Sequence, residues 1–303
     1  MSSTMQGIHC VLYALFTPSG ALDREAMRFQ VAQMLSLNVD GIVVLGLATE
    51  VHKLDQSEQE ALVNWAAEDI AARVPLAVTV TGNSVAQQRH MVRFALAHGA
   101  SSLILQPPAA GDYSSETCID FFSDVADGFD ATFAIQNAPQ YLGQSLSDSQ
   151  IGQLRARNPG FSVVKSESSA VGLASLVEAL DSTMSVLNGR GGLEMIDCLF
   201  AGANGFILAP DVIDKSKRVV DLWCKGDLDA ARNAYAEVLP TIVFVMQSIE
   251  HLICYGKRLY GLRSGIEIHD RSPAMAPSAF GIAAVERFAA KLGPIHRDQI
   301  MRL

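Results

Sequence analysis

The sequence predicts an α/β fold, a (β/α)8 TIM barrel with an appended C-terminal helical layer. Hydrophobic runs too short for helices recur eight times along the first two thirds of the chain. Segments with helical periodicity alternate with these runs. A repeat of roughly 20–35 residues favours a closed barrel over an open doubly wound sheet. The last third of the chain shows helical patterns and no further strand signal.

The eight predicted strands are rich in β-branched or aromatic residues, and each ends at a glycine, a proline or a polar residue. Most are apolar at consecutive positions, as expected of parallel strands that are buried on both faces. In chain order they span residues 9–17, 40–46, 76–82, 102–108, 132–139, 161–167, 184–189 and 205–210.

The predicted helices lie between these strands, and several begin at a residue that favours a helix N-cap. Ser57 is followed three residues later by Glu60, which is the pattern of a capping box. These helices span residues 23–37, 57–73, 84–98, 114–127, 147–157 and 193–201.

The C-terminal part of the chain exceeds the single helix that a barrel needs for closure, which predicts the appended helical layer. One helix begins at Asp227, and residues 249–259 lie in another. We therefore expect residues 1–211 to hold the barrel strands and most barrel helices. Residues 212–303 should hold the last barrel helix and the C-terminal helices.

The composition indicates a soluble, cytoplasmic protein whose partner is a small molecule. The chain has 23 Lys and Arg against 32 Asp and Glu, a net charge of -9, and no basic run. Nucleic acids and anionic membranes both require a positive surface, so neither is expected as a partner. No stretch reaches the ~18 consecutive apolar residues of a membrane span, and residues 1–7 do not resemble a secretory signal. Five scattered cysteines fit reduced thiols.

Lys165 is the most unusual polar residue at the predicted strand ends, where the chemistry of such barrels is located. It follows Phe161-Ser-Val-Val in a buried run, where an ammonium ion is costly to desolvate. Burial favours loss of the proton, and the free amine can then attack a carbonyl to form a Schiff base. The alternative is a structural lysine paired with Glu50 or Glu167.

Glu167 is two residues after Lys165, and side chains at this spacing point to the same face of a strand. A carboxylate beside an iminium could remove a proton from the neighbouring carbon, because the cation acidifies that C–H bond. The alternative role for Glu167 is a counter-ion that only holds Lys165.

Gly189 and Arg190 lie in a glycine-rich turn after the seventh predicted strand. The backbone N–H groups and the guanidinium of this turn could bind a carboxylate, and a plain turn with a solvated arginine is the alternative. The histidines show no metal-ligand spacing, and the motifs for dinucleotides, phosphate loops and serine hydrolases are absent from the sequence. We therefore expect neither a metal nor a cofactor.

Taken together, the residues at the strand ends resemble the dihydrodipicolinate synthase / N-acetylneuraminate lyase superfamily, over nearly the whole chain. The matching segments are Phe16-Thr17-Pro18, Gly46-Leu-Ala-Thr-Glu50, Gln136-Asn-Ala-Pro139, Val164-Lys165-Ser-Glu and Leu187-Asn-Gly189. This resemblance implies a Schiff-base enzyme in which Lys165 is the reactive lysine, and it implies a homotetramer.

Several positions depart from the pattern of this superfamily. Leu47 and Ala48 replace the two threonines that bind the keto-acid carboxylate and relay protons, and Gln136 replaces the tyrosine that shuttles protons. Tyr141 stands in place of the arginine that holds the aldehyde substrate, and Pro108-Ala109 replaces a tyrosine pair. These losses argue against both a lysine-biosynthetic synthase and an ordinary sialic acid lyase.

A Schiff-base lysine with a nearby carboxylate and no tyrosine shuttle is similar to the branch that dehydrates 2-keto-3-deoxy sugar acids, in particular L-2-keto-3-deoxyarabonate dehydratase. The resemblance implies a hydro-lyase that forms 2-oxoglutarate semialdehyde, with Lys165 and Glu167 as catalytic residues. The residues expected to bind the 2-keto acid are Ala48, Thr49, Gln136, Asn137, Gly189 and Arg190.

Two other functions stay open from the sequence. A pyruvate-dependent class I aldolase or lyase of the same superfamily would need another proton shuttle, with Tyr141 or Tyr113 as candidates. A non-catalytic keto-acid-binding relative would explain the number of lost catalytic positions, but it has no evident need for a buried amine at Lys165.

Overall fold

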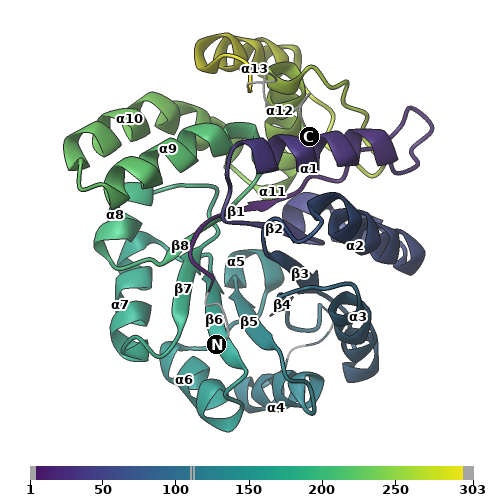
Figure 1. Ribbon diagram of the computed structural model, residues 1–303, viewed down its shortest axis with the longest axis vertical. Helices are drawn as coiled ribbons and strands as arrows, with labels where there is room; N and C mark the ends of the chain where they lie inside the picture. Colours follow the sequence, from purple (N-terminus) through teal and green to yellow (C-terminus); the bar gives the residue numbers. More distant parts are fainter. Residues whose placement is uncertain (1–4, 110, 112, 296–303) are drawn as a thin grey trace.

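Eight parallel strands close into a barrel in the order in which they occur along the chain (Figure 1). The computed structural model describes residues 5–109, 111 and 113–295. Each strand pairs with its two neighbours in the chain, and β1 pairs with β8 to close the barrel. The strands are β1 (Gly7–Val11), β2 (Gly41–Val44), β3 (Leu76–Val80), β4 (Ser102–Leu105), β5 (Thr132–Asn137), β6 (Phe161–Ser166), β7 (Ser185–Asn188) and β8 (Gly205–Leu208).

A ring of helices surrounds the strands, and Figure 1 shows these helices around the outside of the barrel. They are α1 (Arg24–Ser36), α2 (Gln56–Ile70), α3 (Val85–Ala97), α4 (Ser115–Ala126), α6 (Asp148–Arg157), α7 (Ala170–Leu180), α8 (Met195–Phe200) and α9 (Ile213–Cys224). Short helical turns also follow three of the strands: η1 (Leu47–Thr49) and η2 (Val51–Lys53) after β2, α5 (Pro139–Leu142) after β5 and η3 (Pro210–Val212) after β8.

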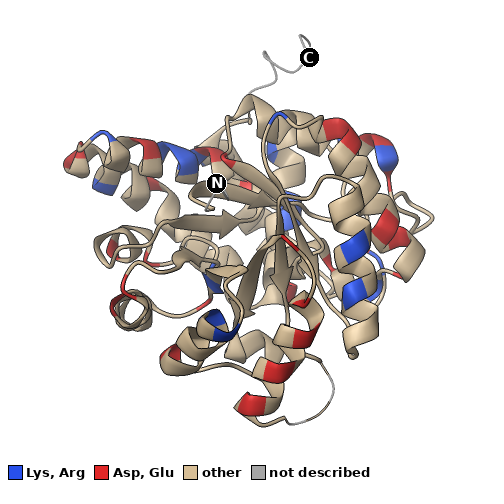
Figure 2. Ribbon diagram, turned by 60° about the horizontal axis from the view of Figure 1, so that its bottom comes forward, with Lys and Arg blue, Asp and Glu red and all other residues tan. Residues whose placement is uncertain are grey.

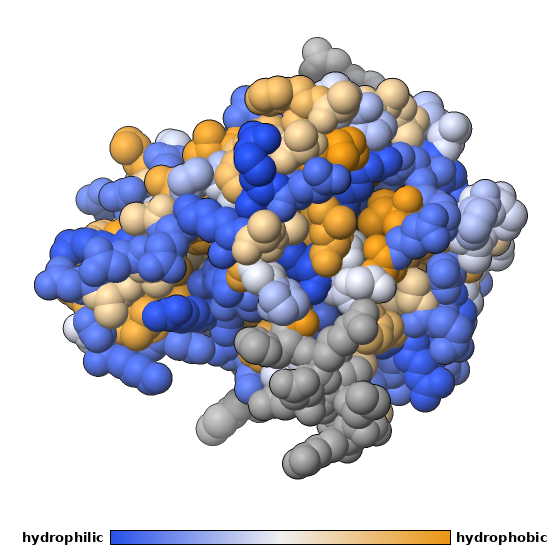
Figure 3. All heavy atoms as spheres, turned by 90° about the horizontal axis from the view of Figure 1, so that it is seen from above, coloured by the Kyte–Doolittle hydropathy of each residue, from blue (hydrophilic) through white to orange (hydrophobic). Residues whose placement is uncertain are grey.

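The predicted barrel with its C-terminal helical layer is confirmed. After α9 the chain continues in α10 (Leu228–Val245), α11 (Ile249–His251), η4 (Leu252–Gly256), α12 (Lys257–Ser264) and α13 (Ala279–Leu292). Asp227 is the N-cap of α10, as predicted, because its side chain accepts a hydrogen bond from the backbone of Ala230. Figure 3 looks onto the face that carries these helices, where hydrophobic patches lie among hydrophilic ones.

The predicted strands extended too far at their C-terminal ends. The first strand stops at Val11 rather than at residue 17, and the fourth stops at Leu105 rather than at residue 108. Residues beyond these points remain buried, but they leave the sheet to build the loops at the mouth of the barrel. A continuous apolar run therefore marks burial and does not mark the last paired residue.

The predicted start of the second helix was also wrong, since the capping box is formed by Asp55 and Glu58 rather than by Ser57 and Glu60. The Asp55 side chain accepts from the backbone N–H of Glu58 at 2.9 Å, and the Glu58 carboxylate accepts from the backbone N–H of Asp55 at 3.1 Å. The Ser57 hydroxyl donates to Asp55 instead, at 2.7 Å. The helix α7 was not among the predicted helices, and the one after β7 is shorter than the predicted 193–201.

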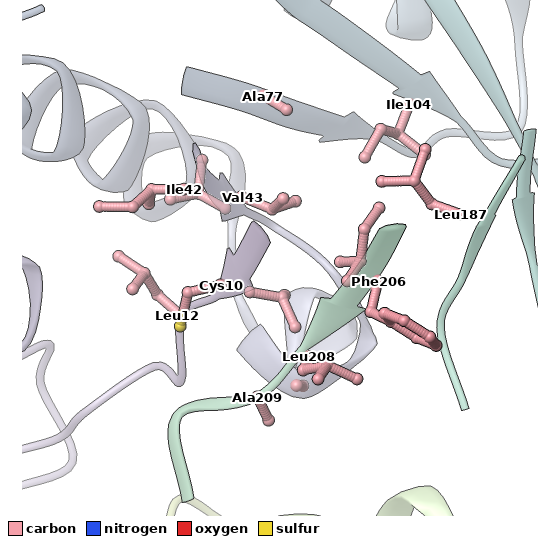
Figure 4. Packing of buried hydrophobic residues seen from close by; sticks show 14 of the residues in the cluster. Cys10, Leu12, Ile42, Val43, Ala77, Ile104, Leu187, Phe206, Leu208 and Ala209 are labelled. Carbon is pink, nitrogen blue, oxygen red and sulfur yellow. The ribbon is translucent and has the colours of Figure 1, made fainter. Parts of the chain in front are cut away.

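Apolar side chains fill both the barrel and the space between its strands and the helices. Figure 4 shows part of this packing, with Cys10 of β1, Ile42 of β2, Ile104 of β4 and Phe206 of β8. Acidic and basic residues lie mostly on the outer helices, and the central strands are largely free of them (Figure 2). A charged residue inside the barrel therefore needs a specific explanation.

In the part of the chain that the structure describes, no single helix is long and apolar enough to cross a membrane. Only α10 together with the helical segment Ile249–Ser264, a pair bent by 106°, passes such a test, by length and composition alone.

Candidate active site

The hydrogen-bond register places polar residues of neighbouring strands at one level of the barrel interior. Gln136 of β5 lies opposite Lys165 of β6, and Lys165 lies opposite Leu187 of β7. Residues in register on neighbouring strands, and residues two positions apart on one strand, point to the same face. Lys165, Glu167 and Gln136 therefore converge inside the barrel, at the ends of the strands where such folds carry out chemistry.

A cavity of about 30 Å³ opens beside Lys165 and Glu167. Lys165 and Glu167 are the ionisable side chains among the described residues that line it, and the remaining lining is apolar or glycine. The barrel supplies most of the lining, and the C-terminal helices supply the rest. The lining residues are Val11, Leu47, Ala48, Lys165, Glu167, Gly189, Gly191, Ile207, Ala209, Met246, Ile249 and Leu252.

Lys165 and Glu167 form a buried ion pair. The distance from Lys165 Nζ to Glu167 Oε1 is 3.2 Å, and each residue is 4% exposed. Of the two structural partners considered from the sequence, Glu167 is the one in contact with Lys165. Glu50 instead contacts Lys53 and Lys257, at 2.6 and 2.5 Å.

Gln136 contacts the same carboxylate oxygen. Its Nε2 donates to Glu167 Oε1 at 3.3 Å, and its Oε1 accepts from Gln106 Nε2 at 2.8 Å. The Gln140 side chain also donates to the backbone carbonyl of Glu167, at 2.7 Å. The carboxylate of Glu167 is thus in contact with Lys165 of β6 and with Gln136 of β5. Gln106 was not among the site residues predicted from the sequence, although a polar residue at the end of a barrel strand was an available signal.

Gly189 is packed against both ionisable residues. A Cβ atom at this position would lie 2.5 Å from Glu167 Oε1 and 2.8 Å from Lys165 Cε. Any larger residue would overlap one side chain or the other, so the predicted site residue Gly189 matters through its small size. Gly191 is packed in a similar way against Met246 at the end of α10, because a Cβ there would lie 2.4 Å from Met246 Cγ.

Ala48 lines the cavity, whereas Thr49 does not. The Thr49 hydroxyl donates to the carbonyl of Leu12 at 2.6 Å, and its side chain is fully buried. The backbone N–H groups of Thr49 and Glu50 donate to the carbonyls of Gly46 and Leu47. The first N–H groups of a helical turn have no partner within that turn, so Leu47 and Ala48 present theirs at the start of η1.

Asn137 and Arg190 lie beside the cavity lining and not within it. The Asn137 side chain donates to the carbonyl of Leu146 at 2.9 Å and accepts from its backbone N–H at 3.0 Å, which holds the chain that follows α5. The Arg190 guanidinium is paired with Glu194 at 2.5 Å and is partly exposed. To bind a substrate, Arg190 would have to leave Glu194.

The two tyrosines considered as proton shuttles occupy different places. Partial burial, reinforced by the negative charge of Glu167, raises the pKa of the Tyr141 phenol, which makes the phenolate harder to form. Tyr113 lines a separate cavity with Val85, Phe121 and other residues of α3 and α4. Neither side chain lines the cavity beside Lys165.

A buried carboxyl group lies close behind the site, at the end of β8. Burial raises the pKa of Asp211 to about 6, although the Tyr13 hydroxyl that donates to it at 3.0 Å opposes this shift. Arg263 donates to the backbone carbonyl of Asp211 at 2.7 Å. Its partners come from the chain that follows β1 and from α12, so the sequence around Asp211 does not reveal them.

The chain is similar to known proteins both in sequence and in fold. Residues 4–275 match the Dihydrodipicolinate synthetase family. A 4-hydroxy-tetrahydrodipicolinate synthase of Methanosarcina mazei is 24% identical over 291 residues, covering 95% of this chain and 98% of the relative. A protein of Escherichia coli, YagE, provisionally named a 2-dehydro-3-deoxy-D-gluconate aldolase, is 24% identical over 255 residues, covering 78% and 80% of the two chains.

Solved structures share the fold at low sequence identity. The crystal structure of YagE in complex with pyruvate has a TM-score of 0.89 at 21% identity, covering 96% of this chain and 99% of that one. Dihydrodipicolinate synthase from Thermotoga maritima has a TM-score of 0.89 at 18% identity, with coverage of 96% and 99%.

Proposed function

Because the chain belongs to the dihydrodipicolinate synthetase family, whose members are lyases that use a Schiff-base lysine, we propose that Lys165 is this lysine and that the protein dehydrates a 2-keto-3-deoxy sugar acid. The substrate would be L-2-keto-3-deoxyarabonate or a close relative, and the product 2-oxoglutarate semialdehyde. One observation carries this proposal: Lys165 and Glu167 are in contact in a cavity that is otherwise apolar.

The proposed reaction begins at the Lys165 amine, which attacks the C2 carbonyl of the substrate. Loss of water gives an iminium, whose positive charge acidifies the C3 protons. Glu167 removes one C3 proton to give an enamine and is itself protonated. The C4 hydroxyl then leaves with the proton carried by Glu167, as water, and a C3–C4 double bond remains. A proton shift from C5 to C3 gives an enol with a C4–C5 double bond, and this enol becomes the aldehyde when C4 gains a proton and the C5 hydroxyl loses one. Hydrolysis of the iminium then releases the semialdehyde and the free lysine.

The apolar surroundings favour this chemistry in two ways. They exclude water from the enamine, and they leave Glu167 as the one carboxylate, among the residues described, that lines the cavity beside Lys165. Dehydration needs no base for the C4 hydroxyl proton, whereas retro-aldol cleavage does. Within the described residues, Gln136 supplies an amide in place of the family tyrosine, and no ionisable group besides Lys165 and Glu167 lines the cavity.

The substrate carboxylate would bind to the backbone N–H groups of Leu47 and Ala48 at the start of η1. Both residues line the cavity, and N–H groups at the first turn of a helix favour anions. Arg190 would join them only after breaking its pair with Glu194.

A pyruvate-dependent aldolase is the second candidate function. It is favoured by the similarity to YagE, which is provisionally named an aldolase and whose structure contains pyruvate. It would require a base for the C4 hydroxyl proton, and the raised pKa of Tyr141 makes that residue a weaker candidate for this step.

Mass spectrometry of the intact protein, after incubation with 2-keto-3-deoxypentonate and reduction by borohydride, separates these functions. An adduct of the dehydrated acid together with free semialdehyde supports the dehydratase, and a pyruvate adduct alone supports the aldolase. The variant Lys165→Arg keeps the positive charge beside Glu167 and should form no adduct. An adduct in this variant, or none in the wild type with either the pentonate or pyruvate, would refute the assignment of Lys165.

We also propose that the protein is a homotetramer. The oligomeric state of enzymes of the dihydrodipicolinate synthetase family supports this proposal. Sedimentation equilibrium of the full chain would give its mass in solution, and a monomer would refute this proposal.

A further inference from the structure

A row of side-chain amides runs across the barrel interior to Glu167. Gln106 at the end of β4 is 5% exposed and Gln136 of β5 is 1% exposed, so neither amide is solvated. Gln106 Nε2 lies 2.8 Å from Gln136 Oε1, and Gln136 Nε2 lies 3.3 Å from Glu167 Oε1. The amides of Gln106 and Gln136 thus form a chain of two hydrogen bonds that ends at one carboxylate oxygen of Glu167.

The direction of donation in this row follows from the carboxylate. An ionised carboxylate only accepts hydrogen bonds, so Gln136 must turn its NH2 group toward Glu167. Its carbonyl oxygen then faces Gln106 and requires a donor there, because an unpaired buried polar atom is costly. Gln106 meets this need with its own NH2 group. If Gln106 offered an acceptor instead, Gln136 would turn over and present its carbonyl oxygen to Glu167.

The backbone of Gln106 is itself anchored. Gln88 of α3 is fully buried and donates from Nε2 to the carbonyl of Gln106 at 2.9 Å and to that of Gly82 at 3.0 Å. This pair of bonds ties the end of β4 to the helix that precedes it, so the Gln106 side chain begins from a fixed position.

The row matters most once Lys165 has reacted with the substrate. In the described residues, Lys165 Nζ and Gln136 Nε2 are the side-chain partners of Glu167 Oε1. In the iminium, Nζ is bonded to the substrate carbon and keeps a single N–H, so it holds the carboxylate less firmly than the free ammonium group with its three donors. The bond from Gln136 then keeps Glu167 in place for the C3 proton, provided that Gln136 keeps its orientation.

We propose that Gln106 is a positioning residue for proton abstraction: it fixes the orientation of the Gln136 amide, and through it the Glu167 carboxylate. This inference rests on the proposed function, in which Glu167 removes the C3 proton. Gln106 itself does not line the cavity and would not touch the substrate.

The test follows exchange of the C3 protons of pyruvate in D2O by NMR, since this exchange requires the same imine and the same base. The variants are Gln106→Met, which removes the donor at similar size, and Gln106→Glu, which places an acceptor opposite Gln136. Each is made in the wild type and in a Gln136→Met background. The exchange rate at saturating pyruvate, its KM, the yield of borohydride-trapped imine and the thermal midpoint are measured for all.

We expect Gln106→Met to lower the saturated exchange rate about fivefold, the scale set by one hydrogen bond between neutral amides. Gln106→Glu should lower it further, on the order of 100-fold, because the Gln136 carbonyl then faces the carboxylate. The KM and the imine yield should change by less than about twofold, since Lys165 chemistry is intact. In the Gln136→Met background, both changes at position 106 should have no further effect on exchange.

Three results would overturn the inference without touching the function proposed for Lys165. The first is an exchange rate that is unchanged in both Gln106 variants. The second is a change in KM and imine yield as large as the loss of exchange rate. The third is the same loss of exchange rate from the position-106 changes in the Gln136→Met background. If Gln106→Glu does not fold, Gln106→Met and its double variant decide alone. Failure of the wild type to form an imine with pyruvate would instead refute the proposed function.

Discussion

Gly189 offers a direct test of how tightly the candidate site is packed. The change is Gly189→Ala, which adds a single methyl group at the end of β7. The backbone of Gly189 lies outside the left-handed region, so alanine can adopt its conformation. Any effect must therefore come from the space that the methyl group takes.

The magnitude follows from the contacts of that methyl group. It would lie 2.8 Å from Lys165 Cε and 2.5 Å from Glu167 Oε1. Carbon atoms in contact prefer about 3.5 Å or more, so the two side chains must move by roughly 0.7 Å. A displacement of about 1 Å costs on the order of 100-fold in rate, and we expect a loss of 10- to 100-fold. The displaced groups are flexible side-chain ends, so the cost in stability should be near the lower end of the ~1–3 kcal/mol of overpacking.

The assay is exchange of the C3 protons of pyruvate, with urea denaturation to measure stability. Gly152→Ala in α6 is the matched control, because a Cβ there has nothing within 4 Å. It should leave exchange unchanged and raise stability by about 0.5–1 kcal/mol, as expected of alanine in a helix. A folded Gly189→Ala protein with an exchange rate within about twofold of the wild type would refute the reasoning.

Three further changes test the charges in and around the site. Glu167→Gln should lower C3 exchange by about 10²- to 10⁴-fold while a borohydride-trapped imine still forms, because only the base is lost. Asp211→Asn should remove a pH dependence of stability. In the native state the pKa of Asp211 is about 6, so the carboxyl keeps its proton up to about pH 6, whereas an unfolded chain loses the proton near the ordinary aspartate pKa of 3.8. Relative to this variant, the wild type should therefore lose roughly 2 kcal/mol of unfolding free energy between pH 4 and pH 7. Glu50→Gln leaves two buried ammonium groups without their carboxylate and should cost about 3–5 kcal/mol in urea denaturation.

For each of these changes, one result would contradict the prediction. Unchanged exchange in Glu167→Gln would reduce Glu167 to a counter-ion. Parallel stability curves for the wild type and Asp211→Asn from pH 4 to pH 7 would show that the Asp211 carboxyl is ionised throughout. Asp229→Asn breaks an exposed pair with Arg232 and should cost less than about 1 kcal/mol; an equal cost in Glu50→Gln would contradict the buried pairing.

The barrel itself was predictable because its signals are local. Runs that are buried on both faces stay apolar at consecutive positions, and helices keep their own period, so the order of elements can be read along the chain. The boundaries were less predictable. Leu12 is buried like the strand that precedes it, but it lies in a loop, where its carbonyl accepts a hydrogen bond from the Thr49 hydroxyl.

Much of the candidate site was also open to prediction, for the same reason. Lys165 stood out as a charge in a buried run, and its two-residue spacing to Glu167 places both on one face of a strand. Arg190 shows the limit of this reasoning, since a glycine-rich turn cannot reveal that its guanidinium pairs with Glu194.

The sequence alone thus determined the class of fold, the inward pair of lysine and glutamate, and the loss of the tyrosine at Gln136. Only the tertiary structure decided which groups meet that pair. Gln106 reaches Gln136 across 30 residues of chain, and Met246 reaches the cavity from the C-terminal helices. Such contacts depend on strand register and on the placement of whole helices. Both are set by packing across the entire barrel, and no short stretch of sequence encodes them.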